Sequence, residues 1–205
     1  MKLIIASHNV HKIREFRSML KAYKQLDLLS LIDFPQYAPP AETGATFKEN
    51  AILKAEHAAR TLQHFVIADD SGLVVPALNG AQGVYSRRYS GENATDKENR
   101  NKLLCEMRDL QDAARQGYFE CWIALASPQG IEKCVKGVAE GFIADKEKGA
   151  SGFGYDSVFI KHEYGKTFAE MDEATKNRVS HRRKAFDKIL PTLELLLSSE
   201  GAILT

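Results

Sequence analysis

Two adjacent carboxylates at the end of an apolar run are the residues of this chain best placed to do chemistry. The run, residues 65–68, leads directly into Asp69 and Asp70, and Ser71 and Gly72 follow. It predicts a buried strand, and the Ser-Gly pair predicts a turn after it. Carboxylates at the mouth of a buried strand need a partner, and a divalent cation satisfies both. A helix cap or loop pair explains the segment equally well.

Side chains upstream of this pair can complete a cation site. Because neighbouring side chains of a strand point to opposite faces, we expect the two aspartates to have different roles, one structural and one chemical. Glu42 either joins them as a metal ligand or stabilises the start of the next helix. Asn50 and Lys54 share a face of that helix, so Lys54 is a partner of the carboxylates, a phosphate ligand or a solvated residue.

The first predicted strand–helix junction, residues 7–12, has the polar character of a phosphate site. Backbone N–H groups at a helix start favour anions, and Ser7 and Asn9 can donate hydrogen bonds or cap the helix. Lys12 lies in the first turn, where its positive charge is unfavourable against the helix dipole, and a bound anion would reverse that penalty. A simple cap with a solvated lysine is the alternative. The glycine spacing of a Walker loop is absent from this segment.

Two later segments can bind the flat and the anionic parts of a ligand. Glycines flank Phe153 in residues 151–156, which exposes the ring for stacking unless it packs in the core. Residues 176–184 are rich in basic side chains around Ser180, a candidate N-cap that would place cations against a helix dipole. This run could bind an anionic or carbonyl-bearing ligand or form a solvated patch. RNA binding is a weaker interpretation because neighbouring aromatic residues are few. Together the segments suit a magnesium-dependent enzyme acting on a nucleoside phosphate.

The composition limits the class of protein. Of the 205 residues, 44% are hydrophobic and 27% charged, and the formal net charge of +1 argues against broad affinity for nucleic acid or acidic membranes. The three cysteines lack metal-ligand spacing and are predicted to be reduced thiols of a cytoplasmic protein. We expect no signal peptide, and no apolar run approaches the roughly 18 residues that a membrane span requires.

The elements that must position these segments alternate along the chain and predict a mixed α/β fold. Strands are predicted at 2–6, 26–33, 65–68, 119–126, 132–142 and 157–160, and helices at 10–23, 46–62, 95–109 and from about 180 onwards, the last broken or kinked at Pro191. Residues 119–142 read as a hairpin that could form a second lobe. With no linker to mark a boundary, we expect one domain spanning residues 1–205.

Six blocks, in order, give the chain a specific family resemblance. They are SHNVHK, ETGATFKENAILKA, IADDSGL, GVYSRRYSGENATD, GFGYDSVF and KNRVSHRRKA. With them the chain resembles the inosine triphosphate pyrophosphatase family, also called the Ham1 or RdgB family. The resemblance implies hydrolysis of non-standard purine nucleoside triphosphates (ITP, dITP, XTP) to the monophosphate and pyrophosphate, with magnesium, in a cytosolic homodimer. It also implies an elongated mixed sheet flanked by helices, forming one domain of two lobes around a central cleft.

The resemblance further implies roles for individual residues. Asp70 becomes the proton acceptor for a water that attacks the α-phosphorus, and Glu42 and Asp70 become the magnesium ligands. A nearby metal would hold the pKa of Asp70 low. The implied substrate contacts are Ser7, His8, Asn9, Val10, His11, Lys12, Ser71, Phe153, Gly154, Tyr155, Asp156, Lys176, His181 and Arg182. Asp69, Glu49, Asn50 and Lys54 match motif positions with supporting roles. Arg182 or the backbone would read the 6-oxo group of the base.

The chain departs from the family pattern at a few positions, and two other functions compete. Gln82 and Ser157 stand where the family commonly has proline, and Arg87 replaces a small residue. A Maf-type pyrophosphatase shares the fold and similar SHNVHK and SHR blocks, but IADDSG and GFGYD argue against it. A non-enzymatic RNA-binding protein could use residues 176–184, against which the near-neutral charge argues.

Overall fold

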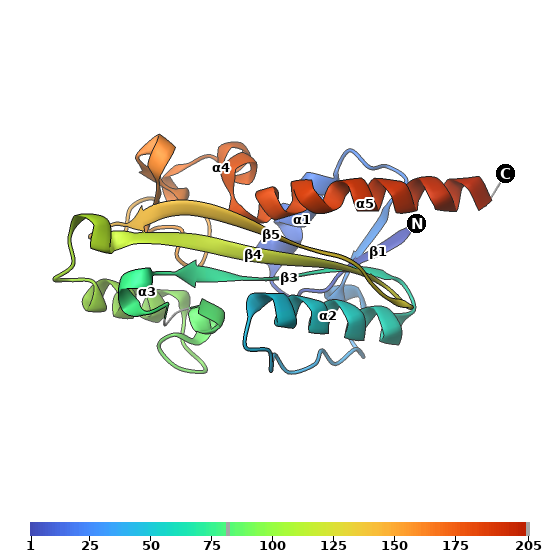
Figure 1. Ribbon diagram of the computed structural model, residues 1–205, viewed down its shortest axis with the longest axis horizontal. Coiled ribbons are helices and arrows are strands. Elements are labelled where there is room, and N and C mark those ends of the chain that lie inside the picture. The colour runs from blue at the N-terminus through green and yellow to red at the C-terminus, as the bar shows by residue number, and fades with distance from the viewer. Residues whose placement is uncertain (81–82, 204–205) are drawn as a thin grey trace. The chain divides into compact units, whose positions relative to one another are not determined.

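A mixed sheet forms the framework of the computed structural model, which describes residues 1–80 and 83–203 (Figure 1). In these residues the sheet has seven strands in the order β2-β1-β3-β4-β5-β6-β7. β1 is parallel to β2 and β3, whereas β6 is antiparallel to β5 and β7. The strands are β1 (Lys2–Ile5), β2 (Asp27–Ser30), β3 (Phe65–Val74), β4 (Gln116–Ser127), β5 (Gly130–Ile143), β6 (Phe159–Lys161) and β7 (Lys166–Thr167). The predicted mixed α/β class is confirmed.

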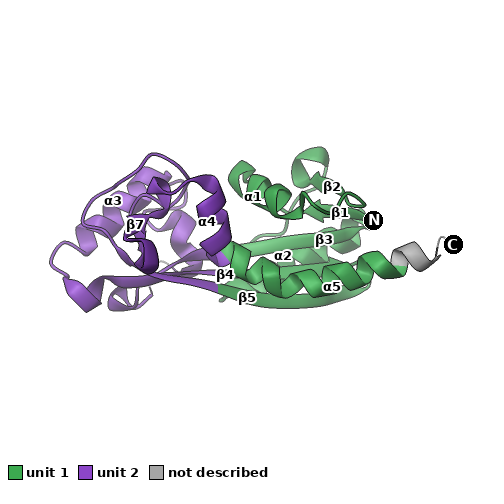
Figure 2. Cartoon of the chain, turned by 90° about the horizontal axis from the view of Figure 1, so that it is seen from above, with its two compact units in different colours: residues 1–70, 121–137, 182–205 green, residues 71–120, 138–181 purple. Residues whose placement is uncertain are grey.

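The chain divides into two compact units (Figure 2). Unit 1 contains residues 1–70, 121–137 and the chain from 182 onwards, and unit 2 contains 71–120 and 138–181. Strands β3, β4 and β5 each pass from one unit to the other. The hairpin of β4 and β5 is therefore shared, and the prediction that it forms a lobe of its own is wrong. One elongated domain with a cleft between two lobes stays a prediction.

Unit 1 packs helices on both faces of its strands. Leu3 and Ile5 of β1 belong to one buried cluster together with Phe16 of α1 (Val10–Leu20) and Phe186 of α5 (His181–Ile203). The intervening Ile4 faces the opposite cluster, which is built on α2 (Phe47–Leu62). This period-two alternation places α1 and α5 on one face and α2 on the other (Figure 1). Small side chains let α2 approach the sheet closely; its alanines 51, 55, 58 and 59 are fully buried.

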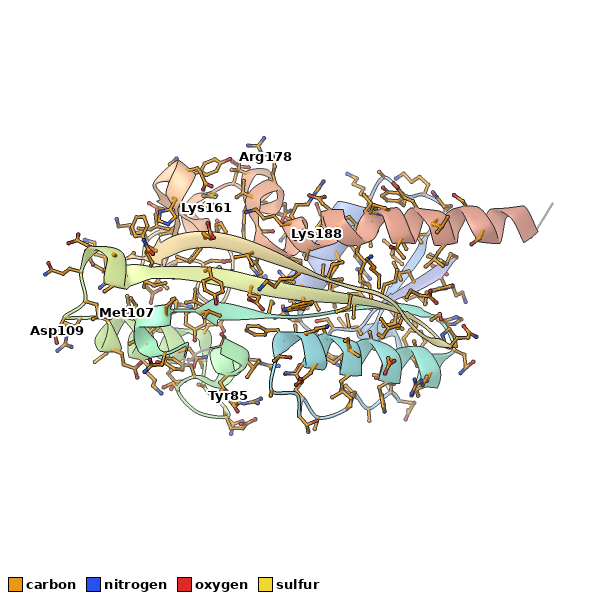
Figure 3. All side chains as sticks on the ribbon, in the orientation of Figure 1. Tyr85, Met107, Asp109, Lys161, Arg178 and Lys188 are labelled. Carbon is orange, nitrogen blue, oxygen red and sulfur yellow. The ribbon has the colours of Figure 1, made fainter. Side chains whose placement is uncertain are left out.

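Unit 2 has its own core beneath α3 (Asp96–Glu106) and α4 (Glu173–Val179). Phe119, Phe159 and Phe168 form an aromatic cluster with ring centroids 4.7–5.8 Å apart. The guanidinium of Arg115 lies buried below α3 and donates to the backbone oxygens of Met107, Leu110, Ile143 and Ala144 at 2.7–3.1 Å. These bonds fasten the end of α3 to β5, and Figure 3 labels Met107 at this point.

Several predicted boundaries were wrong, for identifiable reasons. β3 continues through Ser71 and Gly72, beyond its pairing with β1, because its other neighbour in the sheet, β4, overrides the local turn signal. β2 ends at Ser30, and the next residues form a 3₁₀ turn closed by hydrogen bonds from Ser30 to Asp33. α1 ends at Leu20, before Tyr23.

The C-terminal helix passes through its proline. α5 is continuous at Pro191, because Ile189 and Leu193 are fully buried on either side and packing offsets the lost hydrogen bond. Lys188, which is labelled in Figure 3, also ties this helix to the backbone oxygen of Lys136 at 2.7 Å. The sequence patterns also missed α4 and β7. None of the helices in the described residues has the length and hydropathy needed to cross a bilayer.

Candidate active site

Asp69 lies in β3 as a buried counter-charge for two cations of unit 1. Its Oδ2 accepts hydrogen bonds from Arg182 Nη2 at 2.8 Å and Nε at 3.2 Å, and Lys12 Nζ lies 3.0 Å away. Burial alone would raise the pKa of Asp69, but the charges of Arg182, Lys12 and Lys54 outweigh it and hold this pKa well below its usual range. Asp69 is therefore ionised and engaged in holding α1 and α5 to the sheet.

Asp70 points the other way, as expected for a strand, and has a different environment. Its Oδ1 lies 3.2 Å from Lys54 Nζ, and its Oδ2 accepts a hydrogen bond from Asn50 Nδ2 at 3.2 Å. Burial and the negative charges of Glu42 and Asp69 raise the pKa of Asp70, although Lys54 and Lys12 oppose them. In the metal-free protein the pKa is thus raised, the reverse of the shift expected with a metal beside it.

Lys54 bridges the two carboxylates that were predicted to bind magnesium. Its Nζ lies 2.8 Å from Glu42 Oε1 and 3.2 Å from Asp70 Oδ1. Burial would lower the pKa of Lys54, but Asp70, Glu42 and Asp69 raise it, so the ammonium stays charged. The interpretation of Lys54 as a solvated helix residue is therefore wrong. In the described residues no group of three or more His, Cys, Asp or Glu could hold a metal ion.

Two carboxylates nevertheless fit magnesium, which is usually bound by one or two protein carboxylates together with waters and substrate phosphates.

The helix start fixes the position of this pair. Thr46 Oγ1 accepts from the Glu49 N–H at 3.2 Å, and Glu49 Oε2 accepts from the Thr46 N–H at 3.3 Å, which is the predicted capping box. Asn50 Oδ1 accepts from the Gly44 N–H at 2.8 Å while its Nδ2 holds Asp70, so Asn50 joins the Glu42 loop to β3. Glu49 is thus a capping residue and Asn50 a positioning residue in this structure.

The junction between β1 and α1 is a helix cap with exposed polar groups. Asn9 Oδ1 accepts from the N–H groups of His11 at 2.9 Å and Lys12 at 3.3 Å, and Ser7 Oγ accepts from Asn9 N at 3.0 Å. His8, Asn9, Val10 and His11 are all exposed. Lys12 is not a solvated lysine, because it pairs with Asp69. A capped helix start with a cation behind it keeps the features of an anion site.

The glycine loop belongs to unit 2 and presents a half-buried aromatic ring. Phe153 lies outside the buried core cluster, and Lys176 Nζ sits 4.7 Å from the centroid of its ring. Asp156 Oδ2 accepts from Lys176 Nζ at 2.7 Å and from the Phe153 N–H at 2.8 Å. Gly152 has φ +81°, and a Cβ there would lie 2.1 Å from Asp156 Oδ2, so only glycine fits. The loop therefore holds the half-buried ring of Phe153 in place.

Other predicted contact residues lie in less accessible surroundings. Tyr155 is a core residue whose hydroxyl donates to Ser86 O at 2.7 Å, and burial raises its pKa. His181 is buried and stacks on Phe119 with centroids 4.7 Å apart. Ser71 is half-buried in β3. The predicted substrate contacts of these three residues stay predictions.

The basic run at 176–184 is not a solvated patch at one helix start. Lys176 and Arg178 lie in the last turn of α4, where cations favour the helix dipole, so the dipole argument was wrong for them. Arg182 is 1% exposed and pairs with Glu15 of α1 as well as with Asp69. Burial would lower the pKa of Arg182, but these two carboxylates raise it.

Sequence reasoning missed Glu15, a buried acid that offered only one weak signal, a charge directly beside the apolar position of Phe16. Gln82, one of the two proline replacements, lies outside the described residues.

Comparisons with known proteins find relatives over nearly the whole chain. The sequence model of the Ham1 family matches residues 3–192. The dITP/XTP pyrophosphatase of Protochlamydia amoebophila is 57% identical, covering 96% of this chain and 99% of that protein. The dITP/XTP pyrophosphatase of Chlamydia abortus is 51% identical, covering 98% of each. Among solved structures, a HAM1 protein from Coxiella burnetii covers 95% of this chain and 98% of its own at 38% identity with a TM-score of 0.85. The Staphylococcus aureus Ham1 protein gives 40% identity and a TM-score of 0.83 at the same coverage.

Proposed function

This chain belongs to the Ham1 family, and from that premise we propose that it hydrolyses ITP, dITP and XTP to the nucleoside monophosphate and pyrophosphate. The observation that carries the proposal is identity of 57% and 51%, over nearly full length, to proteins named dITP/XTP pyrophosphatases. Such a hydrolase keeps deaminated purines out of DNA and RNA. Membership of the Ham1 family leaves the Maf-type and RNA-binding readings without support, and the burial of Lys176 and Arg182 weakens the RNA reading further.

The pair formed by Glu42 and Asp70 is the proposed magnesium site. These two carboxylates would hold the metal, which would supply a Lewis acid to offset the charge of the phosphates. Asp70 is the proposed proton acceptor for the water that attacks the α-phosphorus. Burial raises its pKa in the metal-free protein, whereas bound magnesium would lower this pKa and keep the carboxylate ionised and able to accept the proton. Lys54 already lies within reach of both carboxylates, so its ammonium is positioned to contact the departing pyrophosphate.

The exposed helix start at residues 7–12 is the proposed site for the triphosphate. Its backbone N–H groups and the cation Lys12 supply positive potential. Asp69 keeps Lys12 in place from behind, which is a supporting role without chemistry.

The glycine loop of unit 2 is the proposed site for the base. Phe153 offers a ring face for stacking, and Lys176 and Asp156 fix the loop around it. Selectivity for a 6-oxo purine requires a donor where adenine presents its amino group, because a buried donor left unpaired rejects the analogue strongly. Arg182 and His181 are proposed contacts by resemblance. Arg182 would need to exchange part of its ion pairing with Asp69 and Glu15 to serve in that role.

We also propose magnesium as the metal, a homodimer as the working form and the cytoplasm as the location. The cytoplasmic proposal agrees with the free thiols of Cys105, Cys121 and Cys134. The dimer rests on the family resemblance, and light scattering after size exclusion measures it directly. Neither a membrane nor a nucleic acid is expected as a stable partner.

The test is turnover of dITP in parallel with dATP and dGTP in the presence of magnesium, with the products resolved by chromatography. We expect dIMP and pyrophosphate from dITP and little loss of the standard nucleotides. Release of orthophosphate, or no reaction with dITP and XTP, would reject the proposed function.

A further inference from the structure

One turn of α3 holds both backbone polar groups of Gly154 in the glycine loop. The Gly154 N–H donates to Asp96 Oδ2 at 2.7 Å, and Arg100 Nη1 donates to Gly154 O at 2.9 Å. Asp96 and Arg100 are four residues apart and therefore share one face of the helix. Helix and loop both belong to unit 2 (Figure 2). Gly154 has φ +59°, which glycine adopts without strain.

The same arginine connects to the far end of the loop. Arg100 Nε lies 3.0 Å from Glu147 Oε2, and Ser157 Oγ donates to that oxygen at 3.0 Å. A continuous polar chain thus runs from α3 through Arg100 and Glu147 to Ser157. The family pattern commonly has proline at this position, which would restrict the backbone by itself. In this chain a serine hydroxyl supplies a side-chain tie to Glu147 at the same place.

The polar chain matters because the loop borders empty space. A cavity of about 200 Å³ within unit 2 is lined by Arg100, Glu147 and loop residues 149–154, 156 and 157. A segment with a cavity on one side has few apolar contacts there to fix its position. The bonds between α3 and Gly154, and the one that Ser157 donates to Glu147, therefore add to the backbone hydrogen bonds that join the loop to residues 148 and 169.

We propose that Asp96 and Arg100, linked to Glu147 and Ser157, are positioning residues for the base-binding loop at 153–156. The inference rests on the proposed function, because it takes this loop as the site of the base. Release of Gly154 would let Phe153 occupy several positions, and the base would bind more weakly. The chemistry at the phosphate belongs to other residues, so KM should rise while kcat changes little.

The experiment compares Arg100→Ala and Arg100→Lys with Lys97→Ala, a control that removes an exposed charge from the same helix. Three quantities are measured on the full chain: kcat and KM for dITP, amide hydrogen exchange of residues 150–158, and the melting temperature. Loss of a hydrogen bond from a charged donor predicts a KM increase of roughly tenfold in Arg100→Ala with kcat within about threefold. The KM of Arg100→Lys should lie between those of the wild type and Arg100→Ala, since one ammonium cannot contact both Gly154 and Glu147 as the guanidinium does.

The outcomes separate this inference from the proposed function. Faster exchange at 150–158 together with a KM effect confined to the Arg100 variants supports the positioning role. Unchanged KM and exchange in Arg100→Ala, or a fall in kcat that Lys97→Ala shares, overturns it. Should the wild-type protein leave dITP intact, the proposed function fails, and exchange alone decides whether α3 holds the loop.

Discussion

Neutralising Asp69 should destabilise the protein, whereas the chemically identical change at the adjacent Asp70 should not. Asp69 is buried against Arg182 and Lys12, and breaking a buried ion pair typically costs 3–5 kcal/mol. Asparagine keeps one acceptor, so we expect Asp69→Asn to lower the free energy of unfolding by about 3 kcal/mol. In a chain of this size that lowers the melting temperature by roughly 6–12 °C.

Asp70→Asn should leave the metal-free protein as stable as the wild type or more so. Folding raises the pKa of Asp70, so its ionised form is less favourable in the folded protein than in the unfolded chain. Turnover of dITP should nevertheless be lost, because the proposed proton acceptor is gone.

The pH dependence distinguishes the two aspartates further. The lowered pKa of Asp69 contributes stability that is complete above the unfolded value and declines only as pH falls below it, towards the folded pKa. An unfolded aspartate titrates near pH ~3.9, so the deficit of Asp69→Asn should persist at pH ~5. The raised pKa of Asp70 means that the wild type gains stability as pH falls through that pKa. As the pH falls, any stability advantage of Asp70→Asn over the wild type should therefore shrink before the stability deficit of Asp69→Asn does.

Differential scanning calorimetry without metal, at neutral and mildly acid pH, measures both effects. Asp109→Asn is the matched control, since Asp109 is exposed (Figure 3). Equal melting temperatures for Asp69→Asn and the control, or a large loss in Asp70→Asn, would refute the division of roles argued from the alternation of β3.

The remaining predictions concern the metal, the thiols and the core of unit 2. Magnesium should raise the melting temperature of the wild type but not of Glu42→Gln, and an equal rise in both would remove Glu42 from the metal site. A thiol reagent at pH ~8 should modify the exposed Cys105 in the native protein but Cys121 only after unfolding, because burial raises the pKa of Cys121; mass spectrometry of the adducts shows which reacted. Arg115→Met should lower the free energy of unfolding by about 3 kcal/mol, because it removes the donors of buried backbone oxygens. Urea titration measures this loss, with Arg178→Met as the control because Arg178 is exposed (Figure 3). Equal losses of stability in the two variants would contradict this reasoning.

Local patterns predicted the elements of unit 1 well. The capping box at Thr46 and the alanine face of α2 are local features, and both were found where the sequence placed them. The opposite orientations of Asp69 and Asp70 followed from strand geometry alone. The turn predicted at Ser71 and Gly72 failed because strand pairing depends on residues distant in sequence, which no local window contains.

The partners of the site residues were less predictable, for the same reason. Arg182 meets Glu15 across 167 positions of sequence, and Arg100 reaches Gly154 across 54. Neither contact leaves a periodic or compositional signal. The basic run illustrates the consequence: it reads as one cationic patch, yet the fold buries Lys176 against Asp156 and Arg182 against Asp69.

Hydrolysis of dITP in ¹⁸O-labelled water tests the central claim most directly, because it reports which phosphorus the water attacks. Attack at the α-phosphorus predicts one labelled oxygen in dIMP and none in pyrophosphate, as mass spectrometry of both products would show. Label in pyrophosphate with unlabelled dIMP, or labelled orthophosphate, would contradict the account.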